Sequence, residues 1–211
     1  RSQGRNISPS EFIPIAEKCH LMPVMDRYVI SSICQFIRFG LDQGLKLVPI
    51  SINLSSRYLF MASTIAFIFE KIGEYKIPAR LIEIEVTEYE LIENFENTAT
   101  NMERLQKAGI KVAIDDYGIG HSNLETVSSL PIQHLKIDQS FIKRALCSNK
   151  SKAILENIIH LAQSLQIEIT AEGVETEEQL AYVTGLGCDY AQGYLLSKPL
   201  SQRDFESLLS E

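Results

Sequence analysis

Five side chains in this sequence could together bind hard divalent cations, because each offers oxygen atoms near the end of an apolar segment. They are Asn53, Glu85, Asp115, Asp116 and Glu172. Oxygen-only donor sets suit Mg²⁺ or Mn²⁺, and four carboxylates at one site repel one another unless cations neutralise them. The adjacent Asp115 and Asp116 could each reach one of two ions, and two ions about 3.5–4 Å apart activate water and clamp a phosphoryl oxygen in phosphodiester cleavage. Lys136 could orient that water or offset phosphate charge.

Each of these residues also has an ordinary structural interpretation. An isolated Asp-Asp pair most often forms a turn or a helix cap, and an isolated Glu on a strand is usually solvated or ion-paired. A lone lysine such as Lys136 is most often a surface charge. The metal interpretation is favoured because these residues fall at the ends of successive predicted strands.

Six short β-rich segments alternate with helical segments along the chain. The predicted strands cover residues 47–54, 81–87, 111–116, 134–138, 167–172 and 189–194. The main predicted helices cover residues 24–39, 59–72, 97–108, 151–165 and 176–186. Residues 8 to 11 and 176 to 179 have the pattern of capping boxes, Ser201 caps a last short helix, and three glycines mark helix ends, namely Gly40, Gly109 and Gly187. This alternation predicts parallel βα units.

Each predicted strand is apolar on one face and polar on the other. In the second strand, for example, Ile82, Ile84 and Val86 alternate with Glu83 and Glu85. Strands covered by helices on both faces of a sheet would be apolar on both, so the alternation favours a barrel with a polar lumen. About 28 residues separate successive strands, close to the ~31 per unit of a (β/α)₈ barrel, whose active site lies at the carboxyl ends of the strands.

We therefore expect an α/β fold, a (β/α)₈ TIM-like barrel that is incomplete here, with about six of its eight strands visible. The missing strands are expected before Arg1. Residues 1–211 are thus predicted to form a single domain that lacks its N-terminal strands, with any upstream domains of the longer protein outside this sequence.

The composition excludes several classes of function. The chain has 211 residues and a net charge of −7, from 20 Lys and Arg against 27 Asp and Glu, which argues against a nucleic-acid polymer as partner. Its most apolar stretch, residues 60–69, is about half of the ~20 residues that a membrane helix needs, so no membrane contact is expected from this segment. The four scattered cysteines are expected to be reduced thiols in the cytoplasm, although upstream domains could tether a longer protein to a membrane.

Seven motifs carry a resemblance to a known family. They are SPSEFIPIAE at 8–17, SINLS at 51–55, EIEVTE at 83–88, DDYG at 115–118, LKID at 135–138, AEGVET at 171–176 and AQGYL at 191–195. In this order and over nearly the whole chain, they resemble the EAL domain, the bacterial cyclic-di-GMP phosphodiesterase family. The resemblance implies a (β/α)₈-like barrel whose first strand is antiparallel, and hydrolysis of cyclic di-GMP to linear pGpG with Mg²⁺ or Mn²⁺ at a two-metal site.

The resemblance also implies roles for individual residues. The five oxygen donors named above look like the metal ligands, and Lys136 looks like the residue that helps activate the water. Glu175 resembles a residue that orients the site, and Gln192 resembles a site residue near metal-bound water or phosphate. Asp138 and Pro199 correspond to substrate-binding positions. In the family, one loop links the site to a homodimer interface, and its counterparts here are Glu88, Tyr117, Gly118, Ile119 and His121.

Two departures from the family pattern bear on activity. The Glu-Ala-Leu motif, whose Glu is a metal ligand, is absent and is expected on a strand before Arg1, so we expect this fragment itself to be inactive or weak. The loop after Asp116 has Ile119 and His121 where the family has threonine and tyrosine. An alternative interpretation is therefore a non-catalytic receptor or interaction module that binds cyclic di-GMP or a protein partner. A third is another two-metal barrel enzyme, such as an enolase-type lyase.

Overall fold

Six parallel strands form one sheet in the order of the sequence. The computed structural model describes residues 7–54, 61–87, 95–117 and 130–210. The strands are β1 (Ile50–Asn53), β2 (Ile82–Thr87), β3 (Lys111–Tyr117), β4 (His134–Ile137), β5 (Glu168–Ala171) and β6 (Tyr190–Ala191), and each pairs in parallel with the next. The sheet is a half-barrel, as the incomplete (β/α)₈ pattern predicts.

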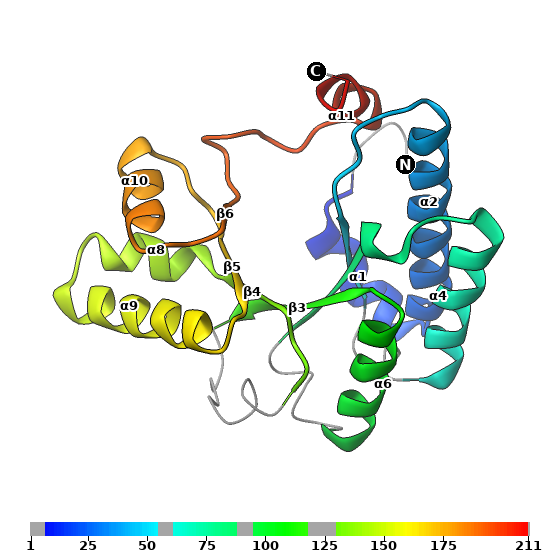
Figure 1. Cartoon of the computed structure of the whole chain (residues 1–211), viewed down its shortest axis with the longest axis horizontal. Coiled ribbons are helices and arrows are strands. Elements are labelled where there is room, and N and C mark those ends of the chain that lie inside the picture. Colours follow the sequence, from blue (N-terminus) through cyan, green and yellow to red (C-terminus); the bar gives the residue numbers. More distant parts are fainter. Residues whose placement is uncertain (1–6, 55–60, 88–94, 118–129, 211) are drawn as a thin grey trace.

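Helices precede β1, follow β6 and connect most successive strands, and they cover one face of the sheet. They are α1 (Pro9–Lys18), α2 (Met22–Asp42), α4 (Ala62–Tyr75), α6 (Phe95–Lys107), α8 (Gln139–Ala145), α9 (Asn149–Ser164), α10 (Glu177–Gly185) and α11 (Gln202–Leu208). Figure 1 shows α2, α4 and α6 on one flank and α8, α9 and α10 on the other. The segment after β6 returns to α2, where the Phe36 and Phe205 rings lie 5.9 Å apart. None of the helices described is both long and apolar enough to cross a membrane.

The two faces of the strands divide as the alternation predicts. Ile52, Ile84 and Val112 on the outer face are buried in one apolar core, together with Ile30 of α2 and Ile159 of α9. The inner face carries buried polar groups, which are Glu83, Glu85, His134, Lys136 and Thr170. The apolar face therefore meets the helices, and the polar face lines the interior of the half-barrel.

Several predicted element ends are confirmed. Thr176 and Gln179 form a complete capping box at the start of α10, and Ser201 caps α11. Gly109 and Gly187 follow α6 and α10 with φ angles of 87° and 82°, a conformation that glycine adopts without a steric cost.

Gly40 is not a helix end, so that prediction is wrong. The helix α2 continues to Asp42, and a Cβ at position 40 would lie 2.8 Å from the Leu47 side chain. Glycine at this position leaves room for the Leu47 side chain, which packs closely against the helix. Ser8 stands at the N-cap of α1 as expected, but its side chain makes no capping hydrogen bond and instead contacts the Ser10 hydroxyl at 2.7 Å.

Two further elements differ from expectation. The helix α8 was not predicted, although Asp138 is its N-cap and accepts a hydrogen bond from the Ser140 amide. The strand β6 has two residues rather than six, because the chain turns at Gly193, whose carbonyl accepts hydrogen bonds from the amides of residues 196 and 197. Tyr194 therefore does not continue the inner face of β6.

Candidate metal centre

The end of β3 brings two consecutive carboxylates to one side of the sheet. Side chains of neighbouring residues on a strand normally point to opposite faces. Asp116 instead has a φ angle of 54°, and the pairing of β3 with β4 shifts between Ile114 and Tyr117. The Asp116 amide donates a hydrogen bond to Asp115 Oδ1 at 3.0 Å. This irregularity places Asp115 and Asp116 together, while Tyr117 enters the core with 1% of its surface exposed.

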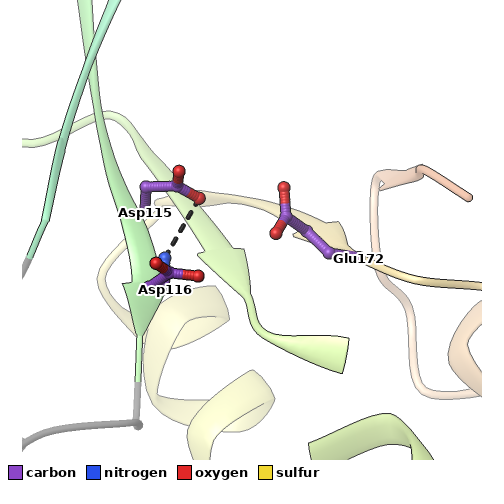
Figure 2. Close-up of side chains that lie close together, drawn as sticks. All are labelled: Asp115, Asp116 and Glu172. Carbon is purple, nitrogen blue, oxygen red and sulfur yellow. Dashed lines mark hydrogen bonds between the residues drawn. The ribbon is translucent and has the colours of Figure 1, made fainter. Parts of the chain in front are cut away.

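Glu172 faces these two aspartates from the end of β5, as Figure 2 shows. One carboxylate oxygen from each of Asp115, Asp116 and Glu172 lies within 4.8 Å of the others. The Glu172 amide donates to the Ile137 carbonyl at 3.0 Å, which fixes the residue at the end of β4. Three carboxylates at this spacing could share bound cations.

A buried lysine stands among the acidic residues. Lys136 Nζ lies 2.7 Å from Glu172, 2.8 Å from Glu85 and 3.4 Å from Asp115, and 8% of its side chain is exposed. Burial alone would lower the pKa of this ammonium, but the hydrogen bonds and charges of Glu172 and Glu85 raise it above its ordinary value. Lys136 is therefore a fixed positive charge, and the prediction of an isolated surface lysine does not apply.

Glu85 is the most deeply buried of the acidic residues at this end of the sheet, with 4% of its surface exposed. Besides Lys136, it accepts a hydrogen bond from Asn53 Nδ2 at 2.6 Å. Asn53 and Glu85 are directly paired residues of β1 and β2, so the strand register itself brings them together. All five oxygen donors expected from the sequence thus lie at the carboxyl ends of their strands.

The acidic groups outnumber the ammonium, and the pKa values of two of them, Glu172 and Asp116, are raised. Burial raises the pKa of Glu172, and the charges of Asp115 and Glu85 raise it further, against the opposing effect of Lys136. Partial burial and the charges of Asp115 and Asp138 likewise raise the pKa of Asp116. An all-oxygen donor set with excess negative charge fits hard divalent cations, which would relieve this repulsion.

A cavity of about 340 Å³ opens beside the acidic cluster. Its lining residues are Asp116, Asp138, Gln139, Glu172, Gly173, Glu175, Gln192, Gly193 and Tyr194. Besides Asp116 and Glu172, three other residues singled out from the sequence therefore lie here: Asp138, Glu175 and Gln192. Glu175 forms an ion pair at 3.0 Å with Lys143, and Asp138 Oδ1 accepts from the Ser140 amide at 2.8 Å.

The remaining expected residues are placed differently. Pro199 lies in the connection between β6 and α11 and does not line this cavity. Tyr117, expected in a loop, is the last residue of β3 and is buried in the core. Four others lie outside the described residues, namely Glu88, Gly118, Ile119 and His121.

Some polar residues close to the site were not singled out from the sequence. Lys143, which holds Glu175, follows Asp138 by five residues and gave no sequence signal. Glu83, His134 and Thr170 are buried two residues before Glu85, Lys136 and Glu172. Their signal was available, because residues i and i+2 of a strand point to the same face.

Known proteins are similar to this chain in sequence. The family profile of the EAL domain matches residues 1–199. The chain is 34% identical over 203 residues to the cyclic di-GMP phosphodiesterase NbdA of Pseudomonas aeruginosa, covering 96% of this chain and 26% of NbdA. It is 34% identical over 208 residues to the signaling protein YkoW of Bacillus subtilis, covering 99% of this chain and 26% of YkoW. The chain thus spans about a quarter of the length of these relatives.

Solved structures of other proteins resemble the fold of this chain. The PaMucR phosphodiesterase in complex with c-di-GMP superposes with a TM-score of 0.91 at 32% identity, over 97% of this chain and 83% of that one. The EAL enzyme Bd1971 in its cAMP- and cyclic-di-GMP-bound form gives a TM-score of 0.92 at 30% identity, over 99% of this chain and 57% of that one.

Proposed function

The chain belongs to the EAL domain family, and we propose that it forms most of a divalent-metal-dependent phosphodiesterase that hydrolyses cyclic di-GMP to linear pGpG. The observation that carries the proposal is the convergence of Glu85, Asp115, Asp116 and Glu172 around Lys136. This cluster lies at the carboxyl ends of parallel strands, where active sites of βα barrels are found. The names of NbdA and PaMucR as phosphodiesterases support the same reaction.

We propose that two Mg²⁺ or Mn²⁺ ions bind the oxygen donors of the cluster. The ligands would be Asn53, Glu85, Asp115, Asp116 and Glu172. Such ions, when bound, polarise a phosphoryl oxygen and lower the pKa of a bound water. The excess of carboxylates over the Lys136 ammonium supports this assignment, because cations would offset the remaining negative charge.

The other residues of the site would bind and orient the reactants. Lys136 would hold Glu85 and Glu172 in place and orient the attacking water. Gln192 and Glu175 line the adjacent cavity, which suits a role in orienting water and phosphate. Asp138 lines the same cavity and, with Pro199, would contact substrate.

We also propose how the barrel is completed and how its site is connected to a second copy of the protein. The half-barrel supports completion by strands from outside residues 1–211, including one that carries the Glu-Ala-Leu motif. Residues 1–211 alone would then hydrolyse substrate weakly or not at all. Glu88, Gly118, Ile119 and His121, together with Tyr117 at the end of β3, would connect the site to a homodimer interface.

A product assay tests the proposed reaction. The full-length protein is incubated with cyclic di-GMP and Mn²⁺, and pGpG is separated by chromatography. We expect product from the unsubstituted protein, none from Glu85→Gln, and an unchanged amount from Glu178→Gln, which removes an exposed carboxylate of α10. Absence of product from the unsubstituted protein, or equal product from Glu85→Gln, would contradict the proposal.

One observation favours a second candidate, a receptor that binds cyclic di-GMP without cleaving it. The Lys136 ammonium already pairs with three of the proposed ligands, which reduces the charge available to cations. Binding of cyclic di-GMP by the full-length protein without formation of pGpG at saturating Mn²⁺ would establish this candidate instead.

A further inference from the structure

A second layer of side chains lies inside the half-barrel, directly beneath the proposed metal ligands. On five successive strands, the residue two positions before each upper-layer residue points to the same face. The lower and upper members are Ser51 and Asn53, Glu83 and Glu85, Ala113 and Asp115, His134 and Lys136, and Thr170 and Glu172. Three members of this lower layer are both buried and polar: Glu83, His134 and Thr170.

Hydrogen bonds join the lower layer across four strands. Ser51 Oγ donates to Glu83 Oε1 at 2.7 Å, and His134 Nδ1 lies 2.9 Å from Glu83 Oε2. His134 Nε2 lies 2.7 Å from Thr170 Oγ1. Burial alone would raise the pKa of Glu83, but the hydrogen bond and charge of His134 lower it below its ordinary value. An ionised carboxylate only accepts hydrogen bonds, so His134 Nδ1 donates to Glu83.

The layer bridges strands that are not neighbours in the sheet. Glu83 belongs to β2 and His134 to β4, with β3 between them. On β3, Ala113 is fully buried and is paired with Glu85 of the upper layer on one side and with His134 of the lower layer on the other, whereas Glu83 is paired with Lys111. The short alanine side chain leaves room for the imidazole and the carboxylate to meet. The Lys136–Glu85 ion pair crosses β3 in the same way one level higher.

The backbone alone does not fix the relative positions of β2 and β4 at the site. No ladder hydrogen bonds join the two strands directly, and the pairing of β3 with β4 is shifted between Ile114 and Tyr117, where Asp115 and Asp116 lie. Buried polar pairs contribute little net stability compared with apolar packing, and their best-attested use is to fix register. A side-chain bridge just below the irregular segment supplies that constraint.

We propose that Glu83, His134 and Thr170 form a positioning layer that sets the register of β2, β4 and β5, and so holds Glu85, Lys136 and Glu172 in the geometry that binds divalent cations. The inference rests on the proposed metal site and adds residues that touch neither metal nor substrate. Ala113 is part of the same positioning layer, because a larger side chain next to His134 would separate His134 from Glu83.

Calorimetric titration of Mn²⁺ into the full-length protein tests the layer without measuring turnover. We expect His134→Leu and Ala113→Val to weaken Mn²⁺ binding by about 10-fold or more, as loss of residues that orient metal ligands typically does. His134→Gln is the rescue variant, because its amide can donate to Glu83 and accept from Thr170, and should bind within about threefold of the unsubstituted protein. Thr170→Val removes one hydrogen bond at nearly constant volume and should give an intermediate loss.

Glu168→Gln is the matched control. Glu168 faces the same interior from β5 and bridges to Lys111 at 2.6 Å, but it lies four residues from Glu172 and 37% of its side chain is exposed. We expect Mn²⁺ affinity within about twofold of the unsubstituted protein, since exposed pairs of this kind contribute little. Equal affinity in folded His134→Leu and Glu168→Gln, or equal loss in His134→Gln and His134→Leu, would overturn the positioning role while leaving the metal site intact. Absence of Mn²⁺ binding by the unsubstituted protein would instead overturn the proposed function itself.

Discussion

Replacing Lys136 with methionine tests how the charges at the end of the sheet are balanced. The substitution keeps most of the side-chain volume and removes one ammonium from three carboxylate oxygens at 2.7, 2.8 and 3.4 Å. With 8% of the Lys136 side chain exposed, solvent cannot replace the lost partner. Breaking a buried ion pair by removing one member costs about 3–5 kcal/mol. We expect that loss in the free energy of unfolding when no divalent cation is present.

Divalent cations should recover part of this loss. A ligand at 100 times its Kd adds about 2.7 kcal/mol to the stability of the state that binds it. Without the Lys136 ammonium the carboxylate cluster is more negative, so the variant should bind Mn²⁺ more tightly than the unsubstituted protein. At a given Mn²⁺ concentration, the gain in stability should therefore be larger in Lys136→Met, even though this variant should no longer hydrolyse cyclic di-GMP.

Urea unfolding with and without Mn²⁺ measures both effects, and Lys111→Met is the matched control. Lys111 makes the same kind of pair with Glu168 inside the half-barrel, but 37% of each side chain is exposed, so its loss should cost about 0–1 kcal/mol. Folding raises the pKa of Lys136. Its contribution to the free energy of unfolding is therefore complete below the ordinary lysine pKa of ~10.4, and it is lost as pH rises through the higher pKa of the folded state. The difference between the variants should thus be constant from about pH 6 to 9. Equal destabilisation by both substitutions, or a smaller Mn²⁺ effect in Lys136→Met than in the unsubstituted protein, would refute the reasoning.

Three further predictions follow from single positions. The pKa of Asp116 is raised on folding, so its ionisation destabilises the metal-free protein as pH rises. Asp116→Asn should therefore increase the free energy of unfolding by up to about 1 kcal/mol at pH 7 and leave it unchanged near pH 3, as measured by thermal unfolding in EDTA. A Cβ at Gly193 would lie 2.1 Å from a backbone carbonyl oxygen, so Gly193→Ala should lose about 1–3 kcal/mol. At Gly185 of α10 an added Cβ would meet nothing within 4 Å, so Gly185→Ala should raise the free energy of unfolding by about 0.4–1 kcal/mol. Equal changes in the two variants, measured by urea unfolding, would contradict the clash at Gly193. Burial raises the pKa of Cys188 to about 11, so a thiol reagent at pH 8 should label the exposed Cys147 much faster, and equal labelling rates would contradict the burial.

The sequence predicts the strands well because their signal is local. A period-two alternation identifies β1 to β5, their inner faces and the residues at their carboxyl ends, and these are what place the acidic cluster. Helix starts with complete side-chain signals, such as Thr176 with Gln179, are predicted for the same reason. The seven-residue α8 was missed because it is too short for a clear apolar period, although Asp138 two residues before Ser140 is a usable capping signal.

What the sequence does not predict depends on contacts between distant segments. Gly40 has the local pattern of a helix end, but its role is the close approach of Leu47. The left-handed backbone conformation of Asp116 accompanies the shifted pairing of β3 with β4, and no local sequence pattern predicts it. Lys136 was expected to act on water or phosphate, and its three carboxylate contacts come from β2, β3 and β5 together.

The polar interior has a physical cost that stability alone does not explain. Interiors of βα barrels are commonly filled with branched apolar side chains, and replacing a buried ion pair with apolar residues is often neutral or stabilising. This half-barrel keeps its branched residues on the outer face, and buries Glu85 and Lys136 above Glu83 and His134 on the inner one. The proposed binding of cations and phosphate would account for the upper pair, because both need charge at the carboxyl ends of the strands. The lower pair, Glu83 and His134, contacts neither the proposed cations nor phosphate. It is explained if a metal site on strands with an irregular register needs a second side-chain contact that fixes the relative positions of these strands. On this argument, the alternation that identifies the strands in the sequence is itself a consequence of the chemistry at their ends.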